Sequence, residues 1–206
     1  MSAQDTANII LGSGSAIRAH IIESAGIPFM AHTSHVDEDL IKTQYIKANK
    51  SIPDLVEKLA FAKAQAVFDT LKCANTDYII GADQVLAFEG RVYDKPKDMD
   101  DAYMRLRALR GAEHQLIGAV CLVHKGSMIW SHISTTKLVM RDFSDDFLQN
   151  YLDQEGESIL ACVGAYKFEG RGAQLFERVE GDFFSILGLS LLPLLTELRR
   201  LAVIET

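Results

Sequence analysis

The sequence predicts a mixed α/β protein built around a long twisted sheet. Short apolar segments alternate with amphipathic ones in the first part of the chain, and strand-like pairs joined by Glu89-Gly90 and Lys125-Gly126 fill the middle. No repeat of fixed period and no Pro/Ser-rich linker interrupts the 206 residues. We therefore expect a single domain over residues 1–206.

The first strand is expected at residues 7–11, followed by the small-residue loop Gly12–Ser15. A helix should come next, because apolar residues recur at helical spacing, and Gly26 marks its end. Its predicted apolar stripe consists of Ile17, Ile21, Ile22 and Ala25. A second strand is expected within residues 27–39, and it leads into the acidic cluster Asp37, Glu38 and Asp39.

The clearest helix covers residues 52–71, and its predicted buried face is Leu55, Leu59, Ala62, Ala66 and Val67. A strand should follow at Asp77–Asp83, and then a hairpin that turns at Glu89-Gly90. The remaining expectations are a helix capped by Asp98 and followed by Gly111, two long antiparallel strands turning at Lys125-Gly126, a helix capped by Ser144, a glycine-rich connection at 162–170, and a buried C-terminal helix over 183–198.

The composition and the net charge of the chain exclude some classes of function. The chain is 48% hydrophobic and 24% charged, and its net charge of −7 argues against a protein that coats a nucleic-acid polymer. Three scattered cysteines, Cys73, Cys121 and Cys162, form no CxxC motif, so we expect reduced thiols in a cytoplasmic protein. Neither a signal peptide nor a membrane span is evident, because the apolar C-terminal run is short and interrupted by Ser190 and Pro193.

The loop Gly12–Ser15 suits an anion, because its backbone N–H groups and hydroxyls meet the positive end of a helix. It is neither a Walker A loop nor a complete GxGxxG motif. Arg18 is the sharper signal, since a cation in the first turn of a helix is unfavourable unless a bound anion offsets it. The alternative is a solvated arginine beside a tight turn.

Two acidic positions predict a metal site. Asp83 follows the apolar run Tyr78–Ile80 and two small residues, and a buried carboxylate there needs a positive partner. Glu38, in the acidic cluster, would join Asp83 in an oxygen-rich site for Mg²⁺ or Mn²⁺. The alternative for both is a solvated surface carboxylate.

The basic candidates are Lys63, between alanines of the long helix, and Lys95, beside Pro96 after the hairpin. Each could equally be an exposed surface lysine. The six histidines form no convincing metal or catalytic pair, and His114 is interpreted as satisfying a backbone carbonyl.

Several segments taken in order identify a family. "LGSGSAIR", "VDE", "AKAQA", "GADQVLAFEG", "DKPKD", "RLRALRGAEH" and "VGAYKFEG" together resemble the Maf family of nucleoside triphosphate pyrophosphatases, over residues 8–200. The resemblance implies a fold related to the inosine-triphosphate pyrophosphatases, with two lobes around a deep cleft. It also implies divalent-metal-dependent cleavage of a nucleoside triphosphate to a monophosphate and pyrophosphate, and a homodimer.

By the same resemblance, Ser13 and Arg18 belong to the phosphate-binding loop, and Glu38 is the acidic metal-site residue. Ser15, in the same loop, is expected to bind the substrate as well. The matched catalytic residues are Asp83, Lys63 and Lys95. The family loop usually reads Ser-Pro-Arg-Arg, so Ser15-Ala16-Ile17-Arg18 lacks one of two arginines. Gln84 and Glu169 resemble the branch associated with N7-methylated guanosine triphosphate.

Two other functions stay open at this point. A nucleotide-binding regulator of septum formation and cell division, with little hydrolysis, would explain the missing arginine. An NAD-binding Rossmann protein rests only on the "GSGSA" loop and lacks the full glycine fingerprint.

Overall fold

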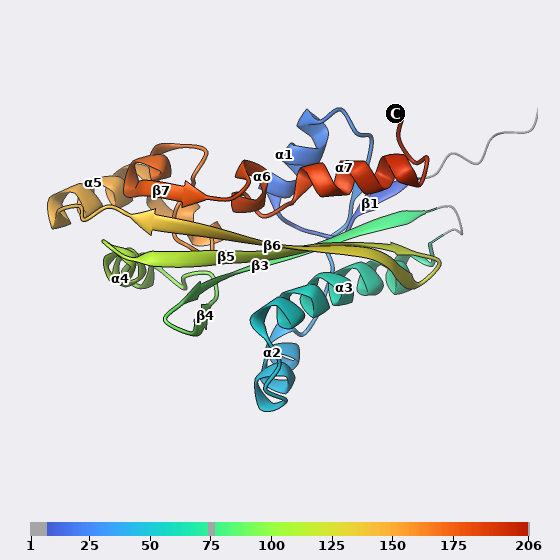
Figure 1. The fold of residues 1–206 in the computed structure, drawn as a ribbon, viewed down its shortest axis with the longest axis horizontal. Coiled ribbons are helices and arrows are strands. Elements are labelled where there is room, and N and C mark those ends of the chain that lie inside the picture. The colour runs from blue at the N-terminus through green and yellow to red at the C-terminus, as the bar shows by residue number, and fades with distance from the viewer. Residues whose placement is uncertain (1–7, 74–76, 206) are drawn as a thin grey trace, which may run out of the picture. The chain divides into compact units, whose positions relative to one another are not determined.

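The computed structural model describes residues 8–73 and 77–205 and confirms a mixed α/β fold. Seven strands among these residues form one mixed sheet in the order β2-β1-β3-β5-β6-β7, with β4 paired to β3 (Figure 1). Strand β1 (Ile9–Leu11) runs parallel to β2 (Met30–Ala31) and to β3 (Tyr78–Phe88), whereas β3 and β4 (Arg91–Tyr93) are antiparallel. The long strands β5 (Glu113–His124) and β6 (Ser127–Met140) are neighbours in the sheet.

The chain divides into two compact units. Unit 1 comprises residues 1–83, 118–134 and 188–206, and unit 2 comprises residues 84–117 and 135–187. Strands β3, β5 and β6 each contribute residues to both units. Each unit has a buried apolar core of its own.

Helices cover both faces of the strands in unit 1. In Figure 1, α3 (Ile52–Leu71) lies along one face, and α1 (Ala16–Ser24) and α7 (Leu191–Arg200) lie along the other. Helix α2 (Glu38–Lys47) packs against α3. The core between these layers includes Ile10, Leu11, Ile22, Leu59, Ile79, Ile80 and Leu194.

Helix α3 begins where the sequence predicts, because Ser51 and Asp54 form a reciprocal capping box at its N-terminus. Its buried face differs from the predicted one: Ala60 and Ala64 are fully buried, whereas Ala62 and Ala66 are only partly buried. The reason is close packing on β3, where a Cβ at Gly81 would lie 2.2 Å from the Ala60 carbonyl oxygen. The helix therefore lies unusually close to the strand at Gly81.

Unit 2 contains the end of β3, strand β4 and the helices α4 (Met99–Leu109), α5 (Asp145–Glu155) and α6 (Phe183–Ile186). Helix α4 is capped by Asp98, and α5 is capped by Ser144, as predicted. The other elements are the short 3-10 helices η1 (Gly156–Ala161) and η2 (Arg171–Leu175) and strand β7 (Phe176–Glu180). Strand β7 pairs antiparallel with β6.

Several sequence predictions need correction. Asp83 does not end its strand, because β3 continues without a break to Phe88. The second strand is only two residues long, and the acidic cluster instead starts α2, where Asp37 Oδ1 accepts a hydrogen bond from the Leu40 N–H. The predicted C-terminal helix is two helices, α6 and α7, separated at Gly188, whose φ is +98°.

Smaller predictions are also resolved by the structure. Ala25, predicted on the buried stripe of α1, is exposed, because the helix ends at Ser24. His114 is buried as expected, but its Nε2 bonds the Tyr166 hydroxyl at 2.9 Å rather than a backbone carbonyl. The three cysteines are free thiols, as predicted, and only Cys121 is fully buried. Ala7 lies outside the described residues.

In the described part of the chain, no helix combines the length and the apolar character that crossing a bilayer requires.

Candidate functional site

Three charged side chains form a tight cluster in unit 1. The Lys63 ammonium lies 2.5 Å from Asp83 Oδ1 and 2.9 Å from Glu38 Oε1, so one cation bridges both predicted metal-site carboxylates. Asp83 is 6% exposed, and the Glu38 side chain retains 38% exposure. The buried carboxylate in the apolar strand therefore has the positive partner that its burial requires.

Three elements bring this cluster together. Asp83 lies two residues after Gly81, where α3 packs closely on β3. That packing places Lys63, one turn after Ala60, beside the strand. Glu38 comes from the first turn of α2, which packs against α3. A second lysine, Lys42, lies 3.9 Å from Glu38 Oε2 on the same helix.

Arg18 is held beside the cluster by backbone groups. Its Nε donates to the Gly188 carbonyl at 2.8 Å, and its Nη1 donates to the Ala82 carbonyl at 2.9 Å. Burial lowers the pKa of Arg18, and the charges of Asp83 and Glu38 oppose that shift. The guanidinium therefore sits one residue from the catalytic candidate on β3, in the electrostatic field of both carboxylates.

The predicted phosphate loop closes around the same arginine. Ser13 is buried, and its Oγ accepts hydrogen bonds from the Ser15 N–H and from Arg18 Nη1. Ser15 stands at the N-cap position of α1, but its side chain makes no capping hydrogen bond. The orphan N–H groups at that helix start are therefore not satisfied by Ser15.

The other predicted residues lie in unit 2. Gln84 directly follows Asp83 in β3, and its Nε2 donates to the Ser185 carbonyl at 2.7 Å. Lys95 and Glu169 are exposed, and within the described residues neither forms a hydrogen bond or an ion pair. The predicted cleft between two lobes stays a prediction.

Comparison with protein families decides the relationship. The model of Maf-like proteins matches residues 8–201, nearly the whole chain. The chain belongs to the Maf-like family. A relative named 7-methyl-GTP pyrophosphatase, from Rhizobium etli, is 42% identical over 97% of this chain and 99% of its own length. A relative named nucleoside triphosphate pyrophosphatase, from Granulibacter bethesdensis, is 43% identical over 93% of this chain and 96% of its own.

Among solved structures, a nucleoside-triphosphatase, described as a dITP/XTP pyrophosphatase, from Mycobacterium abscessus aligns over 66% of this chain and 74% of its own. Its TM-score is 0.36 and its sequence identity is 14%. A likeness this distant has no bearing on the fold or the function of this Maf-like chain.

The carboxylates of Glu38 and Asp83 are chemically suited to a divalent cation. Both present hard carboxylate oxygens, and both already bind one cationic group at a shared point. Within residues 8–73 and 77–205, no three or more His, Cys, Asp or Glu side chains are grouped so that they could hold a metal ion. The remaining ligands of such an ion would therefore be water and substrate oxygens, as Mg²⁺ commonly prefers.

Sequence reasoning missed Arg105, in unit 2. Its Nη1 donates to the carbonyl oxygens of Asp94 and Val163, and its guanidinium lies over the Tyr93 ring. It thereby ties the loop that carries Lys95 to the glycine-rich connection. The sequence held one indication of this role: Arg105 lies at helical spacing with Ala102 and Leu109, on the buried face of α4.

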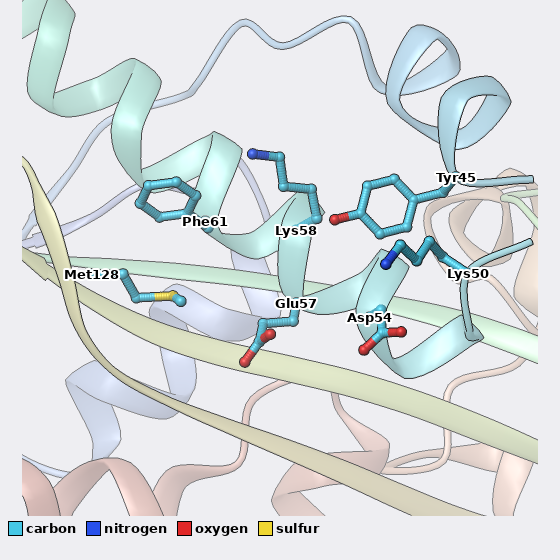
Figure 2. Close-up of a pocket in the computed structure, with 7 residues that line it drawn as sticks. All are labelled: Tyr45, Lys50, Asp54, Glu57, Lys58, Phe61 and Met128. Carbon is cyan, nitrogen blue, oxygen red and sulfur yellow. The ribbon is translucent and has the colours of Figure 1, made fainter. Parts of the chain in front are cut away.

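A surface hollow elsewhere in unit 1 contains none of the predicted site residues. Figure 2 shows its lining of aromatic, sulfur-containing and charged side chains from α2, the α2–α3 connection, α3 and β6: Tyr45, Lys50, Asp54, Glu57, Lys58, Phe61 and Met128. Lys58 Nζ lies 5.3 Å from the centre of the Phe61 ring, which is a cation–π contact. The hollow is thus distinct from the lysine–carboxylate cluster.

Proposed function

We propose that this chain hydrolyses a nucleoside triphosphate to a nucleoside monophosphate and pyrophosphate, using the cluster in unit 1. The observation that carries the proposal is the bridging of Glu38 and Asp83 by Lys63. This cluster unites three residues that the Maf resemblance singles out, in a chain about 40% identical to relatives named as such pyrophosphatases. The names of those relatives support the reaction class.

The charges in the cluster suit hydrolysis of a phosphoanhydride. In this proposal Asp83 accepts the proton of the attacking water, because the Maf resemblance assigns the catalytic acidic residue to this position. Lys63 and Arg18 offset the negative charge that moves onto the leaving pyrophosphate, as cationic groups do in phosphoryl transfer. Nε and Nη1 of Arg18 are engaged by backbone carbonyls, so Nη2 carries the donors for a phosphate oxygen.

Ser13, Ser15 and the residues of unit 2 bind the substrate in this proposal. The N–H groups at the start of α1 and the Ser15 hydroxyl are donors for phosphate oxygens. Lys95 supplies a further cation, and Gln84 and Glu169 recognise the nucleoside. The exposure of Lys95 and Glu169 leaves both side chains available to a ligand.

A divalent cation, Mg²⁺ or Mn²⁺, is part of the proposal, held by Glu38 and Asp83. When bound, it would polarise phosphate oxygens and lower the pKa of a bound water.

We propose N7-methylated GTP as the leading substrate, because Glu169 and Gln84 match the branch associated with it. The two relatives described above, one of each name, match this chain at similar identity, 42% and 43%. Identity alone therefore does not choose between them. A cytoplasmic location, a homodimer, the absence of a nucleic-acid partner and a link to septum formation stay predictions.

The test is pyrophosphate release from a panel of triphosphates with Mg²⁺ or Mn²⁺. The panel contains the four ribonucleotides, the four deoxyribonucleotides and N7-methyl-GTP. We expect turnover that requires the metal, with the highest kcat/KM for N7-methyl-GTP. Saturable nucleotide binding without pyrophosphate release would contradict the enzyme and favour the regulator of cell division.

A further inference from the structure

Lys63 occupies the point between the two carboxylates that a metal would need. Its ammonium lies 2.9 Å from Glu38 Oε1 and 2.5 Å from Asp83 Oδ1. The Lys63 side chain is 14% exposed, so it is largely removed from water in this position. An ammonium and a metal ion cannot share the same carboxylate lone pairs at such distances.

The positive charges around the two carboxylates already offset the negative ones. Glu38 and Asp83 carry two negative charges, and Lys63 and Arg18 carry two positive ones. Lys42 adds a further positive charge 3.9 Å from Glu38 Oε2. A divalent cation arriving alone would therefore enter a site that has no net negative charge and already contains an ammonium at contact distance from both ligands. Like charges at such range repel strongly where water is scarce.

Of the two cations, only Lys63 is free to move. Arg18 is fixed by the carbonyls of Gly188 and Ala82, which lie on two separate segments. Within the described residues, every polar contact of the Lys63 ammonium is to the two carboxylates. Its long side chain can therefore swing away without breaking a bond to the backbone.

We propose that Lys63 is a tethered counter-cation that fills the metal position and yields it only when a triphosphate arrives with the metal. The negative charge of the triphosphate offsets the positive charge that the metal adds, and its oxygens receive the displaced ammonium. Metal and nucleotide then bind cooperatively, because each removes the repulsion that the other would meet. This inference rests on the proposed function in one respect, namely that Glu38 and Asp83 hold the metal.

The test measures Mn²⁺ binding to the whole protein without nucleotide, by electron paramagnetic resonance of the free ion. Wild type is compared with Lys63→Met and with Lys42→Met. Lys42 is the matched control, since it also lies near Glu38 but 3.9 Å from the other oxygen. We expect Lys63→Met to bind Mn²⁺ at least about tenfold more tightly than wild type, and Lys42→Met to change by less than about threefold. Equal or weaker Mn²⁺ binding in Lys63→Met would overturn the proposal.

A second measurement needs no variant. The reactivity of Lys63 toward an amine-modifying reagent is followed by mass spectrometry with Mn²⁺ alone, with a non-hydrolysable triphosphate alone and with both. We expect Lys63 reactivity to change when both are present and to match the ligand-free protein with Mn²⁺ alone at the same concentration. If a low concentration of Mn²⁺ alone changed Lys63 reactivity as much as Mn²⁺ and triphosphate together, the proposal would be contradicted.

These readouts are separable from the proposed activity. If Lys63→Met gains Mn²⁺ affinity but wild type releases no pyrophosphate from any triphosphate, the role of Lys63 as counter-cation stands and the proposed enzyme activity fails. If wild type releases pyrophosphate while Lys63→Met gains no Mn²⁺ affinity, the proposed enzyme activity stands and the role of Lys63 as counter-cation is overturned.

Discussion

The predicted site residues in unit 1 and those in unit 2 differ in how much of their chemistry is already satisfied. In unit 1, Lys63 bridges Glu38 and Asp83, and Arg18 is fastened to two backbone carbonyls. In unit 2, by contrast, Lys95 and Glu169 are exposed and form no ion pair within the described residues. Arg18 is fixed by backbone carbonyls and the two carboxylates are paired with Lys63, whereas the side chains of Lys95 and Glu169 are open to solvent.

This difference separates positioning from recognition. Groups that act on the reacting phosphate gain from being fixed in advance, because no reorganisation is then needed during the reaction. Groups that recognise the variable parts of a substrate can remain solvated until it binds. Changes in unit 1 should therefore affect stability and catalysis together, and changes at Lys95 should affect activity alone.

The largest effect on stability is expected from Gly81→Ala, which would push α3 away from the cluster. The added Cβ would lie 2.2 Å from the Ala60 carbonyl oxygen, 2.8 Å from Ala64 Cβ and 3.0 Å from Cys121 Sγ. We expect a loss of about 3 kcal/mol in the free energy of unfolding, measured by urea denaturation. Gly170→Ala is the control, because the nearest atom to its Cβ would be 3.9 Å away. Equal stability of the two variants would show that α3 does not pack on β3 as described.

His114→Gln should change how the stability of the protein depends on pH. The histidine lies in the buried core of unit 2, so the variant tests that core. Burial lowers the pKa of His114 to about 4, from an ordinary value of 6.5. Between those values the unfolded chain binds a proton at this position that the folded chain does not, so stability falls as the pH drops from 6.5 toward 4. The contribution lost is about 3 kcal/mol by pH 4.

Wild type should therefore lose its advantage in unfolding free energy over His114→Gln as the pH is lowered. Gln keeps a polar partner for the Tyr166 hydroxyl, 2.9 Å from His114 Nε2, but does not titrate. Parallel pH profiles for the two proteins between pH 6.5 and 4 would show that this histidine is not held neutral.

The smallest effect is expected from Lys95→Ala, which should reduce activity without affecting stability. Because its side chain is exposed, the free energy of unfolding should stay within about 0.5 kcal/mol of wild type. Loss of one phosphate-binding cation should raise KM about tenfold. Lys97→Ala, two residues further on and also exposed, serves as the control. An equal rise in KM for both variants would mean that general surface charge, and not Lys95, binds the substrate.

The sequence predicted most of the elements, because apolar spacing and capping residues are local signals. Ser51, Asp98 and Ser144 start their helices as their types suggest. The continuation of β3 past Asp83 was missed, since a carboxylate after two small residues also resembles a strand end. The lysine on α3, with Arg18 nearby, makes a carboxylate tolerable at that position inside a strand.

The composition of the site was more predictable than its geometry. Family motifs marked Glu38, Lys63 and Asp83 separately, but no local pattern reveals that one ammonium joins them, because the partners lie far apart in sequence. The same holds for the two carbonyls that fix Arg18, since any residue type can supply a carbonyl. Long-range pairing of this kind is visible only once the chain has folded.

We propose that the carboxylate of Asp83 acts in catalysis and not only in folding. The most direct measurement compares Asp83→Asn with Asp77→Asn, in pyrophosphate release and in thermal unfolding. Asp77 is the matched control, a buried aspartate just before β3 whose Oδ1 accepts a hydrogen bond from Asn8 at 2.9 Å. We predict that both variants fold, that Asp83→Asn loses at least about 10²-fold in kcat, and that Asp77→Asn keeps most of its turnover. Normal turnover in a folded Asp83→Asn variant would contradict the account.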